Sequence, residues 1–342
     1  MKKTLIFIGP LKKKPDNGVA MKNHLFVDRF REVFDRVIAI DGDKPSKRPW
    51  CIAELVVATL LHPHATIAVS FSVMTGDKVL RLLRRLRRKN VYYWAVGGTL
   101  HERIVELGYD LETYRRIDAI YVQSEKIVKG LNELGITNSI QVNNSKRIDY
   151  YPQLHKKNGD FKRFVFFSRV HPDKGCQMIV NCAKRLNDLG YKEHFLVDFY
   201  GAIDKDYKDF PNIVSDVPNV SYKGFLNVQQ NDGYDTLSAY DIMLFPTYWR
   251  GEGFPGVVID AYIAGLPIIS SDWSCNEEVV DDKTGIIIPH HDEEALFKAM
   301  KKVLDNECDI DQMSEECQRR ASQYDNRLVL SIENLKKIGF YK

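Results

Sequence analysis

Two cations flank the predicted start of a helix in the second half of the chain. Arg169 and Lys174 lie in RVHPDKG, which follows the apolar run RFVFFS and precedes residues 176–189, whose apolar positions recur at helical spacing. A helix start offers free N–H groups and a positive dipole end, and cations add charge-assisted hydrogen bonds. This pattern suits a diphosphate leaving group. The alternative is a surface ion pair for Arg169 and a solvated Lys174.

Two carboxylates flank the start of a later predicted helix, 256–264. Glu252 precedes this helix and Asp260 lies within it, in the run EGFPGVVIDAYIAGLP. One carboxylate can accept hydrogen bonds from a sugar and the other from a ribose diol. Gly253 and Gly256 allow the backbone to approach a ligand closely. The segment therefore fits the sugar and ribose parts of a nucleotide-sugar donor.

The elements that must position these residues alternate between short apolar runs and helical patterns. In the first half the apolar runs are KTLIFIG, RVIAID, ATIAVSFS, VYYWAVGG and DAIYVQS, and in the second half they are RFVFFSR, HFLVDFYG, VSYKGF, DIMLFP, LPIISS and GIIIP. Such alternation is typical of βαβ units on a parallel sheet. The sequence therefore predicts an α/β protein with two doubly wound, Rossmann-like domains.

The two predicted domains meet at a polar segment. Residues 150–160 carry proline and glycine and few apolar side chains, so we expect a hinge there between a domain 1–158 and a domain 159–322. Ligands of open α/β sheets bind beyond the carboxyl ends of the strands. We therefore expect the two domains to face each other across one cleft.

Three motifs occur in order: R-x4-K-G, then EGFPGVVIDAYIAGLPIIS, then TGIIIPHHDEEAL. Together they resemble the signature of the family 4, or group 1, glycosyltransferases, which are retaining, use nucleotide sugars and have the GT-B fold. The resemblance is strongest over residues 163–300 and looser in the first half, through DNGVAMKNHLF and YVQSEKIVKGLNELGI. It implies that residues 323–342 cross back to the first domain, which would bind the acceptor.

The resemblance also implies roles for single residues. It assigns the donor site to Gly18, Arg169, Lys174, Glu252, Gly253, Phe254, Gly256, Val257 and Asp260. Among these, Arg169 and Lys174 would hold the diphosphate, and Glu252 would contact the sugar. Retention in the family is usually explained by front-face attack, which needs no protein nucleophile. Catalysis then rests on charge stabilisation and positioning, so these three are the expected catalytic residues. Asp260 would hold the ribose.

Two features depart from the family's pattern. The family usually has a second glutamate where Asp260 stands, so the ribose contact requires a helix that lies closer. Many relatives carry a histidine near the donor sugar, and VYYWAVGGT has none. Gly97, Gly98 and His101 are the candidate contacts on the acceptor or sugar side. His101 also begins the helical pattern HERIVELG, so packing at a helix start is an equal alternative.

We expect neither a metal nor a cofactor besides the nucleotide-sugar co-substrate. Asp41-Gly42-Asp43 is more typical of a turn than of a metal-binding DxD motif. The six cysteines are scattered without a C-x-x-C pair, which disfavours zinc and disulfides. Neither half has G-x-G-x-x-G after its first strand, which disfavours a dinucleotide oxidoreductase.

The expected function is transfer of a sugar from a nucleotide sugar, with UDP favoured over GDP, to a saccharide or lipid-linked saccharide acceptor. The expected context is cell-surface, capsular or exopolysaccharide biosynthesis in the cytoplasm, because MKKTLIFIGP is too short an apolar run for a signal peptide or a membrane span. The alternatives are a GT-B epimerase or phosphorylase, and a non-catalytic module that binds nucleotide sugars.

Charge divides the chain unevenly. Residues 1–158 carry 28 Lys and Arg against 16 Asp and Glu, a net charge of +12, and residues 159–342 carry 21 against 30, a net charge of −9. Lys78–Lys89 holds seven of these cations beside a helical stripe of Val79, Leu82, Leu83 and Leu86. This pattern suits an anionic membrane surface, and an ordinary Rossmann helix is the alternative. Nucleic acid is disfavoured, because no aromatic residues interleave with the cations.

Overall fold

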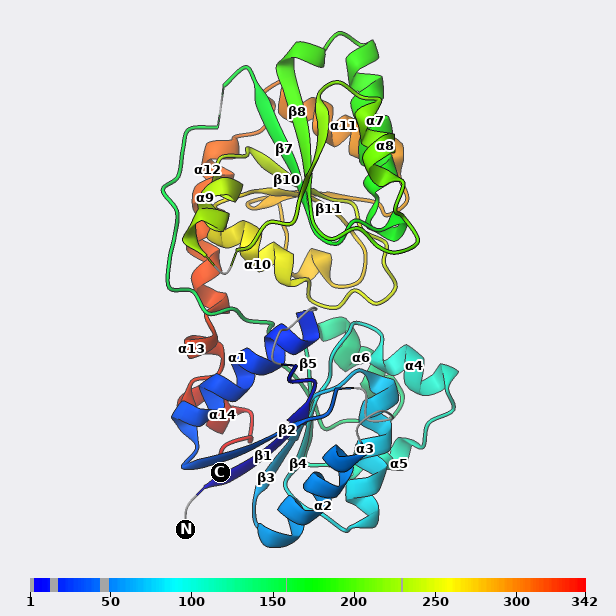
Figure 1. Ribbon diagram of the computed structural model, residues 1–342, viewed down its shortest axis with the longest axis vertical. Coiled ribbons are helices and arrows are strands. Elements are labelled where there is room, and N and C mark those ends of the chain that lie inside the picture. Colours follow the sequence, from blue (N-terminus) through cyan, green and yellow to red (C-terminus); the bar gives the residue numbers. More distant parts are fainter. Residues whose placement is uncertain (1–2, 13–17, 44–48, 158, 229) are drawn as a thin grey trace. The chain divides into compact units, whose positions relative to one another are not determined.

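The computed structural model describes residues 3–12, 18–43, 49–157, 159–228 and 230–342, which form two compact units (Figure 1). Unit 1 contains Met1–Arg147, Gly251–Phe254 and Tyr324–Lys342. Unit 2 contains Ile148–Arg250 and Pro255–Gln323. The chain therefore passes between the units several times, and the two carboxylates Glu252 and Asp260 belong to different units.

Unit 1 is built on a parallel sheet, whose order in the described residues is β2-β1-β3-β4-β5-β6. The strands are β1 (Thr4–Gly9), β2 (Arg36–Asp41), β3 (Thr66–Val69), β4 (Val91–Trp94), β5 (Ala119–Val122) and β6 (Ser139–Gln141). The helices are α1 (Gly18–Val33), α2 (Trp50–Leu61), α3 (Val73–Arg85), α4 (Leu100–Glu106), α5 (Leu111–Arg115), α6 (Glu125–Glu133), α13 (Asn326–Val329) and α14 (Ile332–Lys337).

Alternate residues of β1 face opposite sides of this sheet. Leu5 and Phe7 pack in one apolar cluster with residues of α1 and of the C-terminal segment, and Ile6 and Ile8 pack in another with residues of α2, α3, α4 and α6. Phe340 closes the first cluster, since its ring centroid lies 5.2 Å from that of Phe30 and 5.2 Å from that of Trp94. Both faces of the sheet are thus covered, as a parallel sheet requires.

Unit 2 repeats this architecture with a parallel sheet ordered β12-β11-β10-β7-β8-β9 over the described part of the chain. The strands are β7 (Lys162–Phe167), β8 (Phe195–Tyr200), β9 (Val220–Gly224), β10 (Ile242–Phe245), β11 (Ile268–Ser271) and β12 (Gly285–Ile288). The helices are α7 (Cys176–Asp188), α8 (Phe210–Ser215), α9 (Asn231–Ser238), α10 (Gly256–Ile263), α11 (Glu293–Leu304) and α12 (Ile310–Ala321). The predicted pair of doubly wound α/β domains is confirmed.

The segment that links the units packs with unit 2 rather than unit 1. Lys157 is buried there, and its ammonium donates to the carbonyl oxygens of Ser238, at 3.1 Å, and of Tyr240. Gln318 Nε2 donates to the carbonyl oxygen of Pro152 at 2.9 Å. Residues 148–157 therefore belong to unit 2, although the sequence placed them in the domain 1–158. Their buried hydrogen bonds to α9 and α12 outweigh their polar composition.

The basic helix of unit 1 differs from its expected form. α3 spans Val73–Arg85, so the cations from Arg87 to Lys89 lie beyond its end. Val79, Leu80 and Leu83 are fully buried, whereas Leu82 and Leu86 are only partly buried. The expected apolar stripe was therefore wrong in part. This helix packs on the sheet, as the Rossmann alternative proposed, and its cations lie on the outer side.

Candidate functional site

The loop with Arg169 and Lys174 joins β7 to α7. Val170 is fully buried and anchors the loop, and residues Pro172–Lys174 form a 3₁₀ turn ahead of the helix. Gly175 follows with a φ of +74°, a conformation that glycine adopts without strain, and α7 begins at Cys176. The local structure thus places both cations ahead of a helix N-terminus, as the sequence predicted.

The loop after β10 is held against this turn. The backbone N–H of Tyr248 donates to the carbonyl oxygen of Asp173 at 2.8 Å, and the Tyr248 hydroxyl donates to that of Pro172 at 3.1 Å. A side chain at Gly175 would collide with the carbonyl oxygen of Pro246. The two loops, which are far apart in the sequence, therefore form one rigid surface at the carboxyl ends of β7 and β10.

The two cations differ in environment. Lys174 is only 8% exposed, and its ammonium lies 5.1 Å from the centroid of the Phe245 ring, so the solvated alternative is wrong. Arg169 is exposed, and its guanidinium lies 5.9 Å from the centroid of the Trp249 ring and 4.0 Å from Asp204. A buried cation acts more strongly on a nearby anion than an exposed one, because less water screens it. Lys174 is therefore the stronger electrostatic element of the pair.

Aromatic and histidine side chains surround these loops, and the sequence reasoning missed them. The ring centroids of His171 and Trp249 are 4.6 Å apart, and those of Tyr248 and His291 are 3.8 Å apart. The indole N–H of Trp273 donates to the carbonyl oxygen of Trp249 at 2.7 Å. The sequence could have indicated all of them, because each of these residues follows the end of a predicted strand.

Asp260 lies in α10 and is buried. It is 2% exposed, and the Tyr234 hydroxyl from α9 donates to its Oδ1 at 2.9 Å. Burial, and then the neighbouring charge of Asp260, raise the pKa of the Tyr234 hydroxyl, which therefore remains a donor at neutral pH. Tyr234 was absent from the residues predicted from the sequence. Asp260 is thus one member of a carboxylate–phenol pair.

The segment that carries Glu252 packs with loops of unit 1. A Cβ on Gly253 would lie 3.1 Å from both the carbonyl carbon of Gly97 and the nitrogen of Gly98. The Asn144 side-chain amide donates to the carbonyl oxygen of Phe254 at 3.1 Å. Glu252 therefore lies in the same unit as two of the glycines predicted for the acceptor or sugar side. Gly256 and Val257, in contrast, begin α10 in unit 2.

The two remaining predicted residues lie in different settings. His101, in α4, packs its ring so closely on Gly130 of α6 that a Cβ there would collide with the imidazole. Burial is the main cause that lowers the pKa of His101, which favours a neutral ring. Gly18 begins α1, and a Cβ on it would meet nothing within 4 Å. The residues before it, 13–17, lie outside the described part of the chain.

No candidate metal site occurs among the described residues, in the sense of three or more His, Cys, Asp or Glu side chains placed around one point. Asp41 instead forms a turn, since its Oδ1 accepts from the backbone N–H of Leu11 at 2.9 Å and of Asp43 at 3.0 Å. Within the described ranges, no helix is both long and apolar enough to span a bilayer.

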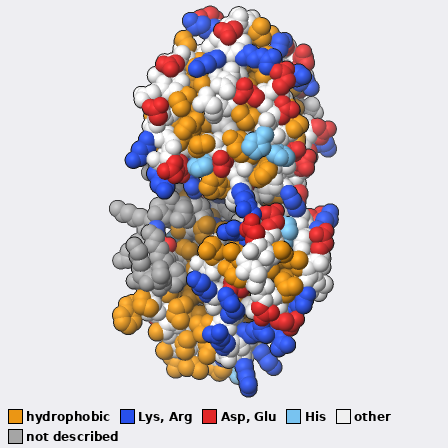
Figure 2. All heavy atoms as spheres, turned by 90° about the vertical axis from the view of Figure 1, so that its right-hand side faces the viewer, with side chains coloured by type: hydrophobic (Ala, Val, Ile, Leu, Met, Phe, Trp, Pro, Cys, Tyr) orange, Lys and Arg blue, Asp and Glu red, His pale blue; other side chains and the backbone are white. Residues whose placement is uncertain are grey.

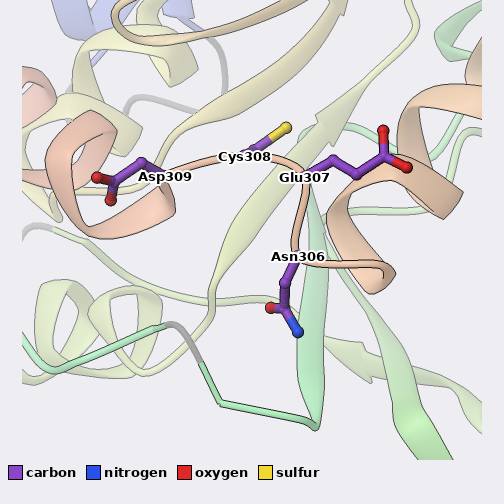
Figure 3. A pocket seen from close by; sticks show the side chains of 4 residues that line it. All are labelled: Asn306, Glu307, Cys308 and Asp309. Atoms are coloured by element: carbon purple, nitrogen blue, oxygen red, sulfur yellow. The ribbon is translucent and has the colours of Figure 1, made fainter.

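One surface hollow lies away from the predicted site. It has a volume of about 490 Å³ and is lined by Asn306, Glu307, Cys308 and Asp309, in the turn between α11 and α12 (Figure 3). None of the predicted site residues lines it. The site described above is therefore identified by its loops and charges rather than by this hollow.

Sequence comparison gives matches to part of the chain. Residues 161–306 match the family model described as glycosyl transferases group 1. A curated relative in Corynebacterium glutamicum, named GDP-mannose-dependent monoacylated alpha-(1-6)-phosphatidylinositol monomannoside mannosyltransferase, is 26% identical over 144 residues. That match covers 41% of this chain and 37% of the relative, so it spans little more than a third of the relative's length.

Solved structures match the whole chain. Sucrose-phosphate synthase from Thermosynechococcus elongatus is similar with a TM-score of 0.76 and 14% identity, and the match covers 99% of both chains. Anabaena HepE in complex with UDP is similar with a TM-score of 0.73 and 14% identity, over 98% of both chains. At these identities the likeness concerns the fold, which both proteins share with this chain over nearly its full length.

Proposed function

We propose that this chain, which has the GT-B fold and whose residues 161–306 match the family model of the group 1 glycosyl transferases, transfers a sugar from a nucleotide-sugar donor to a saccharide or lipid-linked saccharide acceptor. One observation carries the proposal. Lys174 is a buried cation held directly ahead of α7, on a turn that the loop after β10 fixes in place. Such a site suits the diphosphate that leaves when a nucleotide sugar reacts.

The proposed role of Lys174 and Arg169 is to stabilise the departing diphosphate. The bond between the anomeric carbon and the diphosphate oxygen breaks as the acceptor oxygen attacks from the same face, and the acceptor proton passes to the departing diphosphate. The negative charge that develops on the leaving oxygen faces Lys174 and the N–H groups at the start of α7. A single well-placed donor of this kind contributes about 3 kcal/mol to the transition state. The reaction retains configuration and needs no metal.

The remaining donor contacts follow from the two carboxylates. Glu252 accepts hydrogen bonds from the sugar hydroxyls, and Asp260 accepts from the ribose diol. Tyr234 supports the assignment of Asp260, because its hydroxyl holds the buried carboxylate in one orientation. The backbone of residues 253–257 lies beside the sugar.

Gly18, at the start of α1, is a further proposed donor contact, as the family resemblance implies. Gly97 and Gly98 line the acceptor or sugar side, which is supported by their packing on Gly253 next to Glu252. His101 has a weaker claim to a substrate contact, because its ring is engaged against α6. We assign it a positioning role on α4.

The proposed donor is a UDP-sugar, and the proposed pathway is the synthesis of a cell-surface, capsular or exopolysaccharide on the cytoplasmic side of the membrane. HepE has been solved with UDP, which supports UDP, whereas the C. glutamicum relative is named as GDP-mannose-dependent. The two relatives therefore differ in base. A direct comparison of UDP- and GDP-sugars decides the point.

The decisive experiment is a donor screen with matched variants. Thermal unfolding of the purified chain is measured with UDP- and GDP-sugars, and the donors that stabilise it are then incubated with and without saccharide acceptors. We expect stabilisation by a UDP-sugar, slow release of UDP without acceptor, and a glycosylated product with it. Lys174→Met should slow both reactions by roughly 10²–10³-fold, whereas Lys205→Met, which changes an exposed cation of the same unit, should not. The absence of binding and of hydrolysis with every donor would refute the proposal.

Product analysis separates the related activities. An epimerised nucleotide sugar, or a strict requirement for inorganic phosphate, would show an epimerase or a phosphorylase instead. Binding of a donor without turnover by any acceptor, together with unchanged binding in the Lys174→Met variant, would show a binding module with a different site.

A further inference from the structure

The outer face of α2 in unit 1 is apolar. The helix buries Cys51, Leu55, Ala58 and Thr59 against the sheet. Its opposite side exposes Trp50 (74%), Val57 (53%), Leu60 (67%) and Leu61 (71%). At 3.6 residues per turn, the exposed positions fall within about one third of the helix circumference. Glu54 is the one charged residue in the sequence of this helix.

This face differs from that of an ordinary surface helix. A helix packed on a sheet normally presents charged and polar side chains to solvent, and single exposed apolar residues are common. A continuous apolar stripe over the whole length of a helix, in contrast, marks a binding surface. The described residues leave this stripe of α2 exposed.

Cations lie next to this stripe. The Arg88 guanidinium donates to the carbonyl oxygens of His62, at 3.3 Å, and Pro63, at 2.7 Å, which are the two residues after the end of α2. Arg87 and Lys89 beside it are exposed. Figure 2 shows apolar side chains gathered on the lower part of the molecule, with Lys and Arg side chains next to them. The surface thus combines an apolar helix face with a positive edge.

We propose that the outer face of α2 and the cations of residues 85–89 form a single surface that docks on an anionic lipid bilayer. Trp50, Leu60 and Leu61 enter the interface between headgroups and acyl chains, and Arg87 and Lys89 contact the lipid phosphates. Val79, Leu80 and Leu83 of α3 cannot take this part, because they are fully buried in unit 1.

Charge selects the bilayer over other occupants of this surface. A symmetric pair of copies would bring the same cations toward each other, which disfavours association. Nucleic acid would match the cations and leave the apolar stripe in water. An anionic bilayer matches both parts, with phosphates for the cations and an apolar interior for the stripe. Docking needs no donor or acceptor, so it can be tested independently of the proposed transfer activity.

The test is co-sedimentation of the full chain with vesicles of phosphatidylcholine alone or mixed with phosphatidylglycerol. We expect binding to the anionic vesicles that weakens as salt rises. The double variant Leu60→Ser and Leu61→Ser should bind about a hundredfold more weakly, because each buried leucine is worth about a factor of ten. Leu189→Ser, which changes a leucine of unit 2 that is 57% exposed, is the matched control and should bind like the wild type.

A charge variant tests the second part of the surface. Arg87→Gln with Lys89→Gln should weaken binding to anionic vesicles by about 25-fold, at roughly fivefold for each cation, and should leave binding to neutral vesicles unchanged. Lys205→Gln, at an exposed cation of unit 2, is the control and should have no effect. All these side chains are exposed, so thermal unfolding of each variant should match the wild type.

Tryptophan fluorescence reports which face enters the lipid. Trp50 is exposed, so its emission should shift to shorter wavelength on anionic vesicles, and Trp50→Phe should remove the shift. Failure of the wild type to bind anionic vesicles would overturn the proposal, as would unchanged binding of the double leucine variant. A wild-type dimer that the leucine variant converts to a monomer would also overturn it, by showing that a second copy covers the stripe.

Discussion

Replacement of Lys174 by methionine gives the sharpest test of the proposed mechanism. Methionine has nearly the length of lysine and no charge, so it can occupy the same space beside the Phe245 ring. The side chain is 8% exposed, and burial of an ammonium costs several kcal/mol of hydration that methionine does not lose. We therefore expect Lys174→Met to remain folded at the temperature of the assay.

The expected loss of activity is large by comparison. Removal of one preorganised donor from a developing anion costs about 2.7–4 kcal/mol, which corresponds to roughly 10²–10³-fold in rate. Because the charge on the diphosphate grows as the sugar leaves, most of the loss should appear in kcat rather than in KM. Lys174→Arg keeps the charge and should recover part of the rate, limited by the space for a longer side chain between the two packed loops.

The assay is the initial rate of nucleotide release from the donor identified in the screen, with and without acceptor, alongside thermal unfolding of each variant. Lys205→Met controls for the loss of a positive charge elsewhere in unit 2. A Lys174→Met variant whose kcat/KM stays within roughly threefold of the wild type would refute the role of this cation in catalysis. A variant that loses activity only because it unfolds at room temperature would refute the expectation that Lys174 serves function rather than stability.

Three further predictions concern buried groups of unit 2. Tyr234→Phe removes the donor to Asp260 and should lower the free energy of unfolding by about 1.5–3 kcal/mol in urea denaturation. Nucleotide affinity should fall as well, because the carboxylate loses the hydroxyl that orients it, and unchanged affinity would contradict this positioning role. Asp260→Glu should tighten donor binding by up to about tenfold in calorimetry, because the longer side chain reaches further toward the ribose, and a loss of affinity would count against this contact. Burial lowers the pKa of Lys157 from 10.5 to about 8, so between these pH values the unfolded chain binds a proton that the folded chain lacks, and stability should rise with pH. In Lys157→Met this rise in the free energy of unfolding, on the order of 3 kcal/mol, should be absent. Urea denaturation of both proteins at each pH measures it, and the same pH dependence in the two proteins would disprove the assignment.

The architecture could be predicted from the sequence because the relevant patterns are local. In β1, Leu5 and Phe7 lie on one face of the sheet and Ile6 and Ile8 on the other, as the period of two along a strand requires. A parallel sheet also places every strand-to-helix loop at one edge. The order of the motifs therefore indicated which loops carry Arg169 and Lys174 without any knowledge of the packing.

Local patterns predicted the surfaces less well. In the basic segment 78–89, the helix ends before three of the expected cations. Leu80 is buried while Leu82 and Leu86 are only partly buried, because the neighbouring helices determine which side of an amphipathic helix is covered. In α2 nearly every residue is apolar, so periodicity cannot distinguish the face that packs on the sheet from the face exposed to solvent.

The sequence by itself determined the two parallel α/β domains and the residue types at the ends of their strands, since both depend on spacing along the chain. The tertiary structure alone decided that Lys174 is buried while Arg169 is exposed, that Tyr234 holds Asp260, and that α2 presents an apolar stripe beside the cations near Arg88. These features depend on contacts between residues far apart in sequence. Burial and hydrogen bonding are properties of the packed neighbours, and no spacing rule encodes them.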